Sequence, residues 1–414
     1  MNRFLALFHL SWKNVWRNRS RSLVVIMAVA LGVGAGLFMS SFMYGMIMQL
    51  TKSELNNYLS HIQIHHEQFE EEPLAEYSLP NMEVIDMRLS QDPMVQQWVP
   101  RTIATGLASS STGSFGVQIN GVHPHQELAI SELPNFLVEG SYAEGGLIDG
   151  PRNPIVVGKP LAKRLNLKLR SKVVLTTQDV EGELTASAFR VVGILSSPNA
   201  NFDETQVFIP AHRLQDLLRD STAVHEVAIR LNDFRAADSL ALVLQEDFGS
   251  PYIAESWGDL SPTLRYSDSM IGTMLYIIMG IILIALSFGI INTMLMAVLE
   301  RESELGMLMA IGLNPPRTFL MILMESIFLA MIGAPFGLFL AWLGIGALAD
   351  RGIDLGAFAE GMSEYGFGTV IYPEMEPVFY LQVSVLIFIT TVVASLFPAW
   401  KALKLLPIEA IRNH

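Results

Sequence analysis

Three closely spaced histidines are the first residues whose types suggest chemistry, because neutral imidazole is a common metal ligand. His61, His65 and His66 lie in an alternating segment that is typical of a β-strand. On a strand, His61 and His65 share a face but stand about 13 Å apart, while His66 points the other way. Metal–nitrogen bonds of about 2 Å cannot be made by that set. We therefore expect no metal site here.

Motifs for hydrolysis are also missing from the sequence. The phosphate-binding pattern G-x-x-x-x-G-K-[ST] does not occur, because Gly158-Lys159 is followed by Pro160. Neither a G-x-S-x-G nucleophile turn nor an H-E-x-x-H zinc motif is found. We expect a non-catalytic chain without a cofactor of its own.

Hydrophobic segments dominate the 414 residues, of which 51% are hydrophobic and 16% charged. About 20 apolar residues suffice to cross a hydrocarbon core of about 30 Å. By this measure we predict transmembrane helices at 23–48, 269–299, 318–349 and 378–400. The fold class is an α-helical membrane protein with four transmembrane helices and a large α+β extracytoplasmic domain between the first and second.

Basic residues set the orientation of these spans. Segment 1–22 carries five basic and no acidic residues, so the positive-inside rule places the N-terminus in the cytoplasm. We predict an amphipathic N-terminal helix for this segment; the start of the first span is an equally open interpretation. With four spans, the 401–414 tail is cytoplasmic too. In the first span, Gly32 and Gly36 form a small-xxx-small pair that indicates a helix-packing face.

The segment 49–268 is expected to be the α+β domain outside the cytoplasm. It carries 29 acidic and 16 basic side chains, which argues against nucleic acid as a partner. Without cysteine, it has no disulfides. Alternating or amphipathic patterns predict strands at 61–65, 115–119, 172–177, 189–194 and 206–209, and helices at 160–167, 211–219 and 235–248. A further outer loop is expected at 350–377.

A short charged connector, 300–317, joins the second and third spans on the cytoplasmic side. Charged residues lead it, apolar residues then recur at helical spacing, and Gly312 with two prolines ends it. We expect a helix that a soluble partner can push, with an apolar face of Leu305, Leu308 and Met309 and a rim of Glu302 and Glu304.

The connector and the chain end together resemble the signature of FtsX-like, MacB-type (type VII) ABC-transporter permeases. The family pattern E-R-x-x-E-[IL]-G-x-x-x-A-x-G is matched by Glu300, Arg301, Glu304, Leu305, Gly306, Ala310 and Gly312. The pattern [YF]-P-A-x-x-A-x-x-x-x-P-x-x-A-[LI]-R is matched by Phe397, Pro398, Ala399, Ala402, Pro407, Ala410, Ile411 and Arg412. The resemblance covers 270–414 and extends to 1–50, with a looser match in the middle segment, where the family has an inserted lobe that we place near 110–190.

This resemblance implies the function. Such a chain is a permease subunit in the bacterial inner (cytoplasmic) membrane, pairing with a second permease, identical or related, and with a dimer of a separate ABC ATPase that binds ATP and Mg²⁺. Its work is mechanotransmission, in which ATPase motion is passed to the extracytoplasmic domain. The layout is similar to that of lipoprotein-releasing permeases, with membrane lipids, a lipoprotein substrate and a periplasmic carrier as partners. A peptide or drug exporter, and a scaffold acting on a periplasmic cell-wall hydrolase, remain alternatives.

Overall fold

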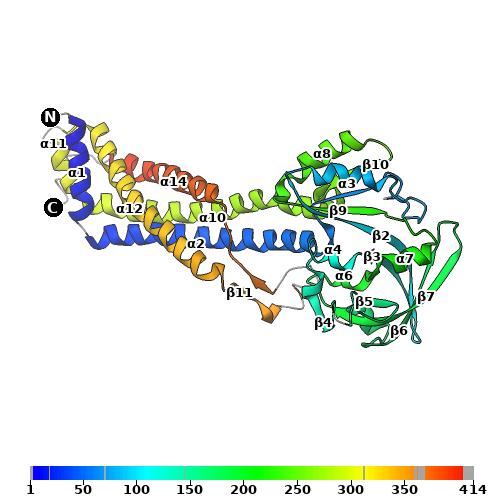
Figure 1. The fold of residues 1–414 in the computed structure, drawn as a ribbon. Helices are drawn as coiled ribbons and strands as arrows, with labels where there is room; N and C mark the ends of the chain where they lie inside the picture. The colour runs from blue at the N-terminus through cyan, green and yellow to red at the C-terminus, as the bar shows by residue number, and fades with distance from the viewer. Residues whose placement is uncertain are drawn as a thin grey trace. The chain divides into compact units, whose positions relative to one another are not determined.

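The computed structural model describes residues 3–17, 19–69, 71–143, 145–310, 313–358, 361 and 369–403. It divides into two compact units (Figure 1). The first comprises Met1–Ile47, Ser269–Asp354 and Val370–His414, and the second comprises Met48–Asp268 with Leu355–Thr369. Each unit has its own hydrophobic core.

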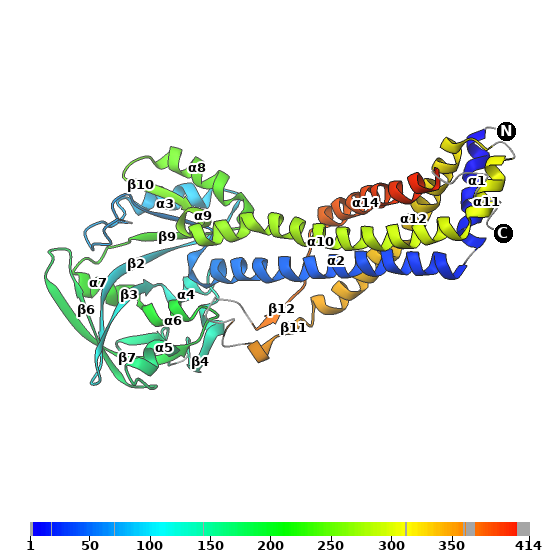
Figure 2. The ribbon, with the colours of Figure 1, turned by 180° about the vertical axis from the view of Figure 1, so that it is seen from behind.

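Helices build the first unit, and four of those in the described residues are long and apolar enough to cross a membrane. These four are α2 (Arg19–Glu54), α10 (Pro262–Glu300), α12 (Pro315–Ala349) and α14 (Pro377–Leu403). Two shorter helices, α1 (Arg3–Arg17) and α11 (Glu302–Ala310), accompany them at the end of the bundle seen in Figure 2. Beyond α12 lie the short pieces β11 (Ile353–Asp354), η4 (Gly356–Phe358) and β12 (Val370–Ile371).

The long helices extend past the limits expected from hydrophobicity alone. The 36 residues of α2 and the 39 of α10 give lengths of roughly 54 and 59 Å at about 1.5 Å per residue, well beyond a core of about 30 Å. Polar end residues such as Thr51 and Ser267 continue the helices because helical hydrogen bonding does not require an apolar side chain. Hydropathy therefore finds the spans but not the helix ends.

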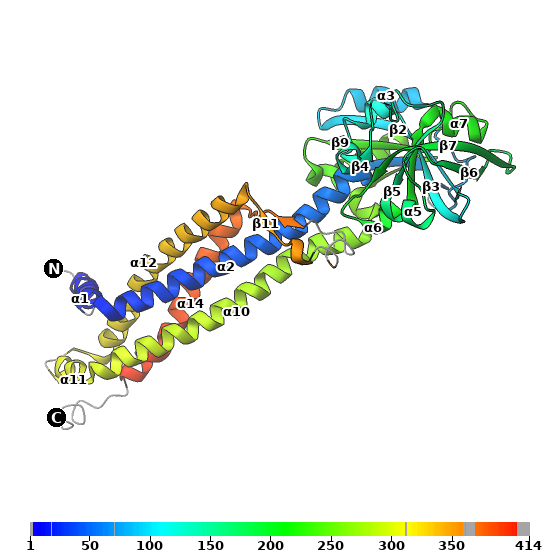
Figure 3. The ribbon, with the colours of Figure 1, turned by 90° about the horizontal axis from the view of Figure 1, so that it is seen from below.

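The second unit is an α/β domain built on one continuous sheet path (Figure 3). The strand order is β10-β1-β9-β2-β3-β8-β5-β7-β4, with β6 pairing both β2 and β7. The strands are β1 (Ile62–His66), β2 (Val95–Ser109), β3 (Ser114–Val122), β4 (Leu137–Gly140), β5 (Pro154–Gly158), β6 (Lys172–Gln178), β7 (Leu184–Leu195), β8 (Gln206–Pro210), β9 (Glu226–Leu231) and β10 (Tyr252–Ser256).

Short helices connect these strands. They are η1 (Leu55–Leu59), α3 (Met82–Ser90), α4 (Pro124–Glu127), η2 (Leu133–Phe136), α5 (Lys159–Arg164), α6 (Ala200–Thr205), α7 (Ala211–Leu218), η3 (Phe234–Ala236), α8 (Ala237–Phe248) and α9 (Trp257–Leu260). The strands predicted at 61–65, 115–119, 172–177 and 206–209 and the helices predicted at 160–167, 211–219 and 235–248 are confirmed to within a few residues, and the strand predicted at 189–194 is the second half of β7.

Strand β2 is shared by two sub-sheets of this domain. Its first half, Val95–Arg101, pairs with β9, and its second half, Thr102–Ser109, pairs with β3. One core gathers residues of β1, β9 and α8, and a second gathers residues of β3, β5, β7 and α7. The second sheet and its cover take in residues from about 102 to 223, a wider segment than the 110–190 expected for the inserted lobe, because they include β8 and α7.

Candidate functional site

The expected coupling segment forms the short helix α11, which is set off from α10 by a turn at Arg301. The Arg301 amide donates to the Val298 carbonyl at 3.2 Å, and the Leu305 amide then donates to the Arg301 carbonyl at 2.9 Å. Asn314, in an extended conformation, precedes α12, and Pro315 occupies its first turn, where a missing N–H is tolerated. Helix α10 is thus followed by a turn and by α11, and α12 begins after the extended Asn314.

An ion pair fixes the base of α11 to the bundle. The guanidinium of Arg301 donates to Glu325 Oε2 at 3.4 Å and to the Asn14 carbonyl at 3.2 Å. Glu325 Oε1 also accepts from the Asn14 side-chain amide at 2.7 Å. The Arg301 and Glu325 side chains are only 14% and 9% exposed. We call Arg301, Glu325 and Asn14 the clamp, because it joins α11, α12 and α1 at one place.

Helix α1 is held along the first turns of α12 by further contacts. The Ser11 hydroxyl donates to the Met321 carbonyl at 3.2 Å. The rings of Phe8 and Trp12 meet Phe328 edge-on at 4.8 and 5.4 Å between centroids. Phe8, Trp12 and Trp16 still leave more than two-fifths of their surfaces exposed, as expected of an aromatic anchor at a membrane interface.

The exposed side of α11 differs from the face expected from the sequence. Leu305, at 5% exposure, lies in the core of the helical unit, and Gly306 is also buried. Met307 is 58% exposed, and Glu304 is exposed beside Arg17, with which it forms an ion pair. Among the side chains of α11 that the structure describes, the exposed apolar one is therefore Met307, which the sequence pattern did not single out. In an apolar run of Leu305 to Met309, periodicity alone does not fix which side faces inward.

The other residues predicted for ATPase coupling are partly exposed or lie outside the described residues. Glu300 is exposed, while Glu302 and Met309 are half-buried. The side chains of Leu308 and Ala310, and Gly312 as a whole, lie outside the described residues. In the C-terminal motif, Pro398, Ala399 and Ala402 are buried in α14, and Pro407, Ala410 and Arg412 lie outside the described residues.

The glycines of the first span contact a neighbouring helix of the same chain. A Cβ placed on Gly32 or Gly36 would lie 3.3 Å from Leu286 or 3.2 Å from Ile282, both at side-chain ends on α10. A closer approach occurs elsewhere. A Cβ on Gly337 of α12 would lie 2.6 Å from both the Ala30 carbonyl and the Val33 Cβ of α2. The tightest of these helix contacts is therefore between α2 and α12.

The three histidines of β1 each have a separate structural contact in the α/β domain. His61 Nδ1 accepts from the Leu231 amide at 3.0 Å, and burial lowers the pKa of His61 to about 4. His65 Nε2 lies 3.3 Å from a Glu255 carboxylate oxygen. His66 stacks on Tyr77. Within the described residues, no group of three or more His, Asp or Glu side chains is arranged to hold a metal.

Family models match both parts of the chain. Residues 22–245 match the MacB-like periplasmic core domain, and residues 276–407 match the FtsX-like permease C-terminal region. The two matches fall on the segments that the sequence motifs and the fold distinguish. Together they include the clamp residues Arg301 and Glu325 and the whole of α11.

Individual relatives are similar over much of their length. The chain is 23% identical to the lipoprotein-releasing system transmembrane protein LolE of Haemophilus influenzae, covering 98% of this chain and 99% of that protein. It is 22% identical to LolC of Xylella fastidiosa, covering 71% and 72%. The periplasmic region of MacB from Actinobacillus actinomycetemcomitans aligns at 13% identity and a TM-score of 0.34, covering 52% of this chain and 98% of that one. The chain, a multi-pass membrane protein, thus belongs to the family of ABC-transporter permeases that carry a MacB-like periplasmic core domain and an FtsX-like permease C-terminal region.

Proposed function

We propose that this chain is the membrane subunit of an ABC transporter that releases lipoproteins from the inner membrane. The observation that carries the proposal is the alignment with LolE, which runs through 98% of this chain and 99% of the relative. A match of that extent takes in nearly all of this chain, and so both its candidate membrane helices and its α/β domain. Two such subunits, identical or related, would pair with two ATPase subunits that bind ATP and Mg²⁺, and a periplasmic carrier would receive the lipoprotein.

The orientation belongs to the same proposal. Both termini would be cytoplasmic, with 23–48, 269–299, 318–349 and 378–400 in the membrane. Segment 300–317 would then be cytoplasmic, and the domain of 49–268 with the 350–377 loop would lie in the periplasm. The five basic residues of the first 22 support this direction through the positive-inside rule.

The clamp offers a route by which ATPase motion reaches the membrane helices. When the ATPases close on ATP, they would displace α11, whose base is joined to α12 and α1 through Arg301, Glu325 and Asn14. A buried charge pair resists separation, since breaking it leaves a poorly solvated charge. The start of α12 would then move with α11. No bond-making step is assigned to this chain.

The ATPase contact is best assigned to Met307 and Glu304. Met307 is the exposed apolar residue among the described side chains of α11, and a flexible thioether suits a groove of irregular shape. Burial of one such side chain contributes roughly 1.5–3 kcal/mol, enough to be an interface anchor. Leu305 would act differently, by holding α11 to its own bundle.

Two aspartate substitutions separate these roles. Met307→Asp should leave the permease folded yet reduce copurification of the ATPase and permease-stimulated ATP hydrolysis at least tenfold. Leu305→Asp should instead destabilise the permease itself, because it places a carboxylate in the core. Met87→Asp is the matched control, since Met87 of α3 is 65% exposed and far along the chain from α11. Wild-type ATPase binding by Met307→Asp would contradict the assigned contact.

The assignment of a lipoprotein as substrate is tested by measuring release of a fluorescent lipoprotein from proteoliposomes that also contain the permease and its ATPase. ATP should drive transfer of the acylated protein to a soluble carrier, while the same protein without acyl chains should not be handled. Efficient export of a soluble peptide or drug, with no lipoprotein release, would refute the substrate assignment and leave the family membership intact.

A further inference from the structure

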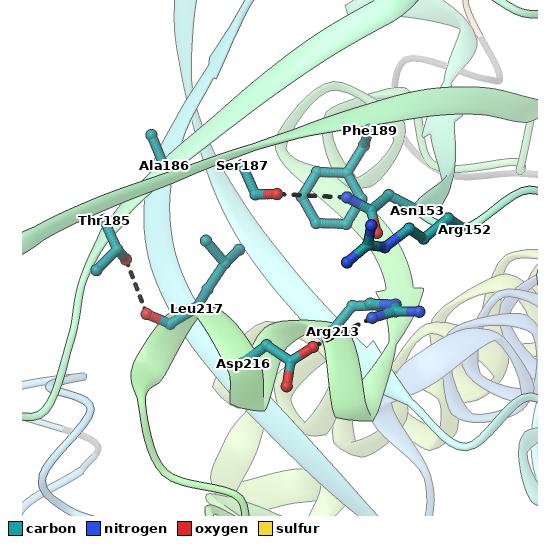
Figure 4. A pocket seen from close by; sticks show the side chains of 9 residues that line it. All are labelled: Arg152, Asn153, Thr185, Ala186, Ser187, Phe189, Arg213, Asp216 and Leu217. Atoms are coloured by element: carbon teal, nitrogen blue, oxygen red, sulfur yellow. Dashed lines mark hydrogen bonds and ion pairs between the residues drawn. The ribbon is translucent and has the colours of Figure 1, made fainter.

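Two adjoining hollows lie in the α/β domain beside β7. The first has a volume of about 460 Å³ and lies between β7, α7 and the segment before β5 (Figure 4). The second has a volume of about 260 Å³ and continues from it, because both are lined by Arg152, Asn153 and Phe189. Neither hollow involves residues of the helical unit.

Positive charge gathers around these hollows in a domain that is otherwise acidic. Residues 152–190 carry eight basic and three acidic side chains, whereas the rest of 51–268 carries eight basic and 26 acidic. Arg152 and Arg213 line the first hollow, and Arg190 and Lys172 line the second together with Arg152. Among the lining residues, all of which the structure describes, Asp216 is the single acid.

Most of these cations have no counterion among the residues that the structure describes. Within the described residues, Arg152, Lys172 and Arg190 form no ion pair, and Arg213 has only Asp216, at 3.2 Å on its own helix. The Asp216 side chain is 68% exposed, so this pair is well solvated and weak. The Nε of Arg213 is shielded from solvent and has no acceptor. A shielded donor without a partner costs free energy until an acceptor arrives.

The polar floor of the first hollow is held in place by hydrogen bonds. The Asn153 amide donates to the Ser187 hydroxyl at 3.3 Å and to the Ala188 carbonyl at 3.0 Å. The Thr185 hydroxyl donates to the Leu217 carbonyl at 2.8 Å. Figure 4 shows Arg152 and Arg213 reaching the same hollow from different elements, with Asn153 beside them. Like charges converging on a fixed polar floor make a site for an anion.

We propose that these hollows bind a phosphoryl group, free or on a lipid headgroup. A guanidinium presents its N–H donors as a planar fork that matches two phosphate oxygens, and three of the four cations here are arginines. A concave site of this size encloses a small polyanion better than it fits an acidic protein surface, which would meet the cations on a flatter face. All of the lining residues belong to the α/β domain, whereas α11 belongs to the helical unit.

Calorimetry on the full-length chain in detergent micelles tests the proposal, with inorganic pyrophosphate as the probe and sodium chloride of matched ionic strength as the blank. The wild type should bind pyrophosphate saturably. Arg152→Ala with Arg213→Ala should weaken binding at least tenfold, and the corresponding pair of lysine substitutions should weaken it less, because charge remains without the fork. Arg164→Ala is the matched control, since Arg164 is 57% exposed, pairs with Glu204 and lines neither hollow.

Two further ligands identify the source of the phosphoryl group, and a second double variant is available if the first does not fold. Binding of soluble glycerol phosphate indicates a free ligand, whereas binding only to vesicles that contain phosphatidic acid indicates a lipid headgroup. If the first double variant does not fold, Lys172→Ala with Arg190→Ala serves in its place. The proposal is overturned if pyrophosphate does not bind, if the variants bind it as the wild type does, or if a polyglutamate peptide binds more tightly than pyrophosphate.

Discussion

Replacing Gly337 by alanine tests the close contact between α2 and α12. The new Cβ would lie 2.6 Å from the Ala30 carbonyl oxygen and from the Val33 Cβ, and both residues are at most 2% exposed. Carbon atoms in ordinary contact stand about 3.5–4.0 Å apart, so the two backbones must separate by about 1 Å. The obstacles are a backbone atom and a β-carbon, which no change of rotamer can move aside.

The size of the effect follows from two opposing terms. Overpacking a well-filled contact costs about 1–3 kcal/mol. Replacing glycine by alanine inside a helix gains up to about 1 kcal/mol. For Gly337→Ala we expect a net loss of roughly 1–2 kcal/mol. For Gly346→Ala on the same helix, a Cβ meets nothing within 4 Å, so we expect only the stabilisation that comes from the higher helix propensity of alanine.

The assay is unfolding of the purified chain in mixed micelles with increasing dodecyl sulfate, followed by tryptophan fluorescence. Gly337→Ala should shift the midpoint to lower dodecyl sulfate, and Gly346→Ala should shift it slightly higher or not at all. Gly36→Ala should fall between these two variants, because its new Cβ would meet only side-chain atoms, Cδ1 and Cγ2 of Ile282 at 3.2 and 3.3 Å. Equal midpoints for the Gly337 and Gly346 variants would refute the close contact.

Two further predictions concern buried charges. Arg301→Ala should destabilise the chain by about 3–5 kcal/mol, because it removes the guanidinium from the buried Glu325 carboxylate, and adding Glu325→Gln should recover part of the loss. Additive losses in the micelle unfolding assay would show that the two side chains do not interact. Burial raises the pKa of Asp203 from 3.8 to about 7. Between about pH 4 and pH 7 the folded chain therefore keeps the Asp203 carboxyl protonated while the unfolded chain does not, and the free energy of unfolding falls as the pH rises through this range. Asp203→Asn should thus gain stability relative to wild type at pH 8, on the order of 4 kcal/mol, and little at pH 4; a pH-independent difference would contradict the raised pKa.

Local patterns in the sequence account for much of the fold. The four apolar runs locate α2, α10, α12 and α14, and alternation locates β1, β6 and the end of β7. These patterns predict helices and strands correctly because the residues that form the buried side of a helix or strand lie only a few positions apart in the sequence. The family itself was indicated by the motif beginning at Glu300 and the one beginning at Phe397, and both family models agree with it.

Long-range pairing accounts for what the sequence did not reveal. Strand β2 was not predicted, because Pro100 and Arg101 interrupt its apolar pattern. Arg101 is nevertheless fully buried, with its guanidinium 2.6 Å from Glu127 Oε1 and 2.7 Å from Glu226 Oε1. Those partners lie 26 and 125 residues along the chain, so no local pattern can reveal that the charge is compensated. The same applies to Gly337, whose importance depends on a helix about 300 residues earlier.

Which side of α11 faces the helical core depends on long-range contacts, and this orientation bears on how the helix would act. A nine-residue helix is too short to be stable alone in water, so its position depends on what holds it. Here Leu305 is buried in the helical core, and Arg301 at its base is paired with Glu325 of α12 and hydrogen-bonded to the Asn14 carbonyl of α1. A partner that engages Met307 and Glu304 on the outer side therefore cannot shift α11 without pulling on both neighbours. We expect uncoupling to follow more readily from loss of the clamp than from loss of the long helices' lipid-facing residues, because the clamp joins the base of α11 to α12 through a buried charge pair.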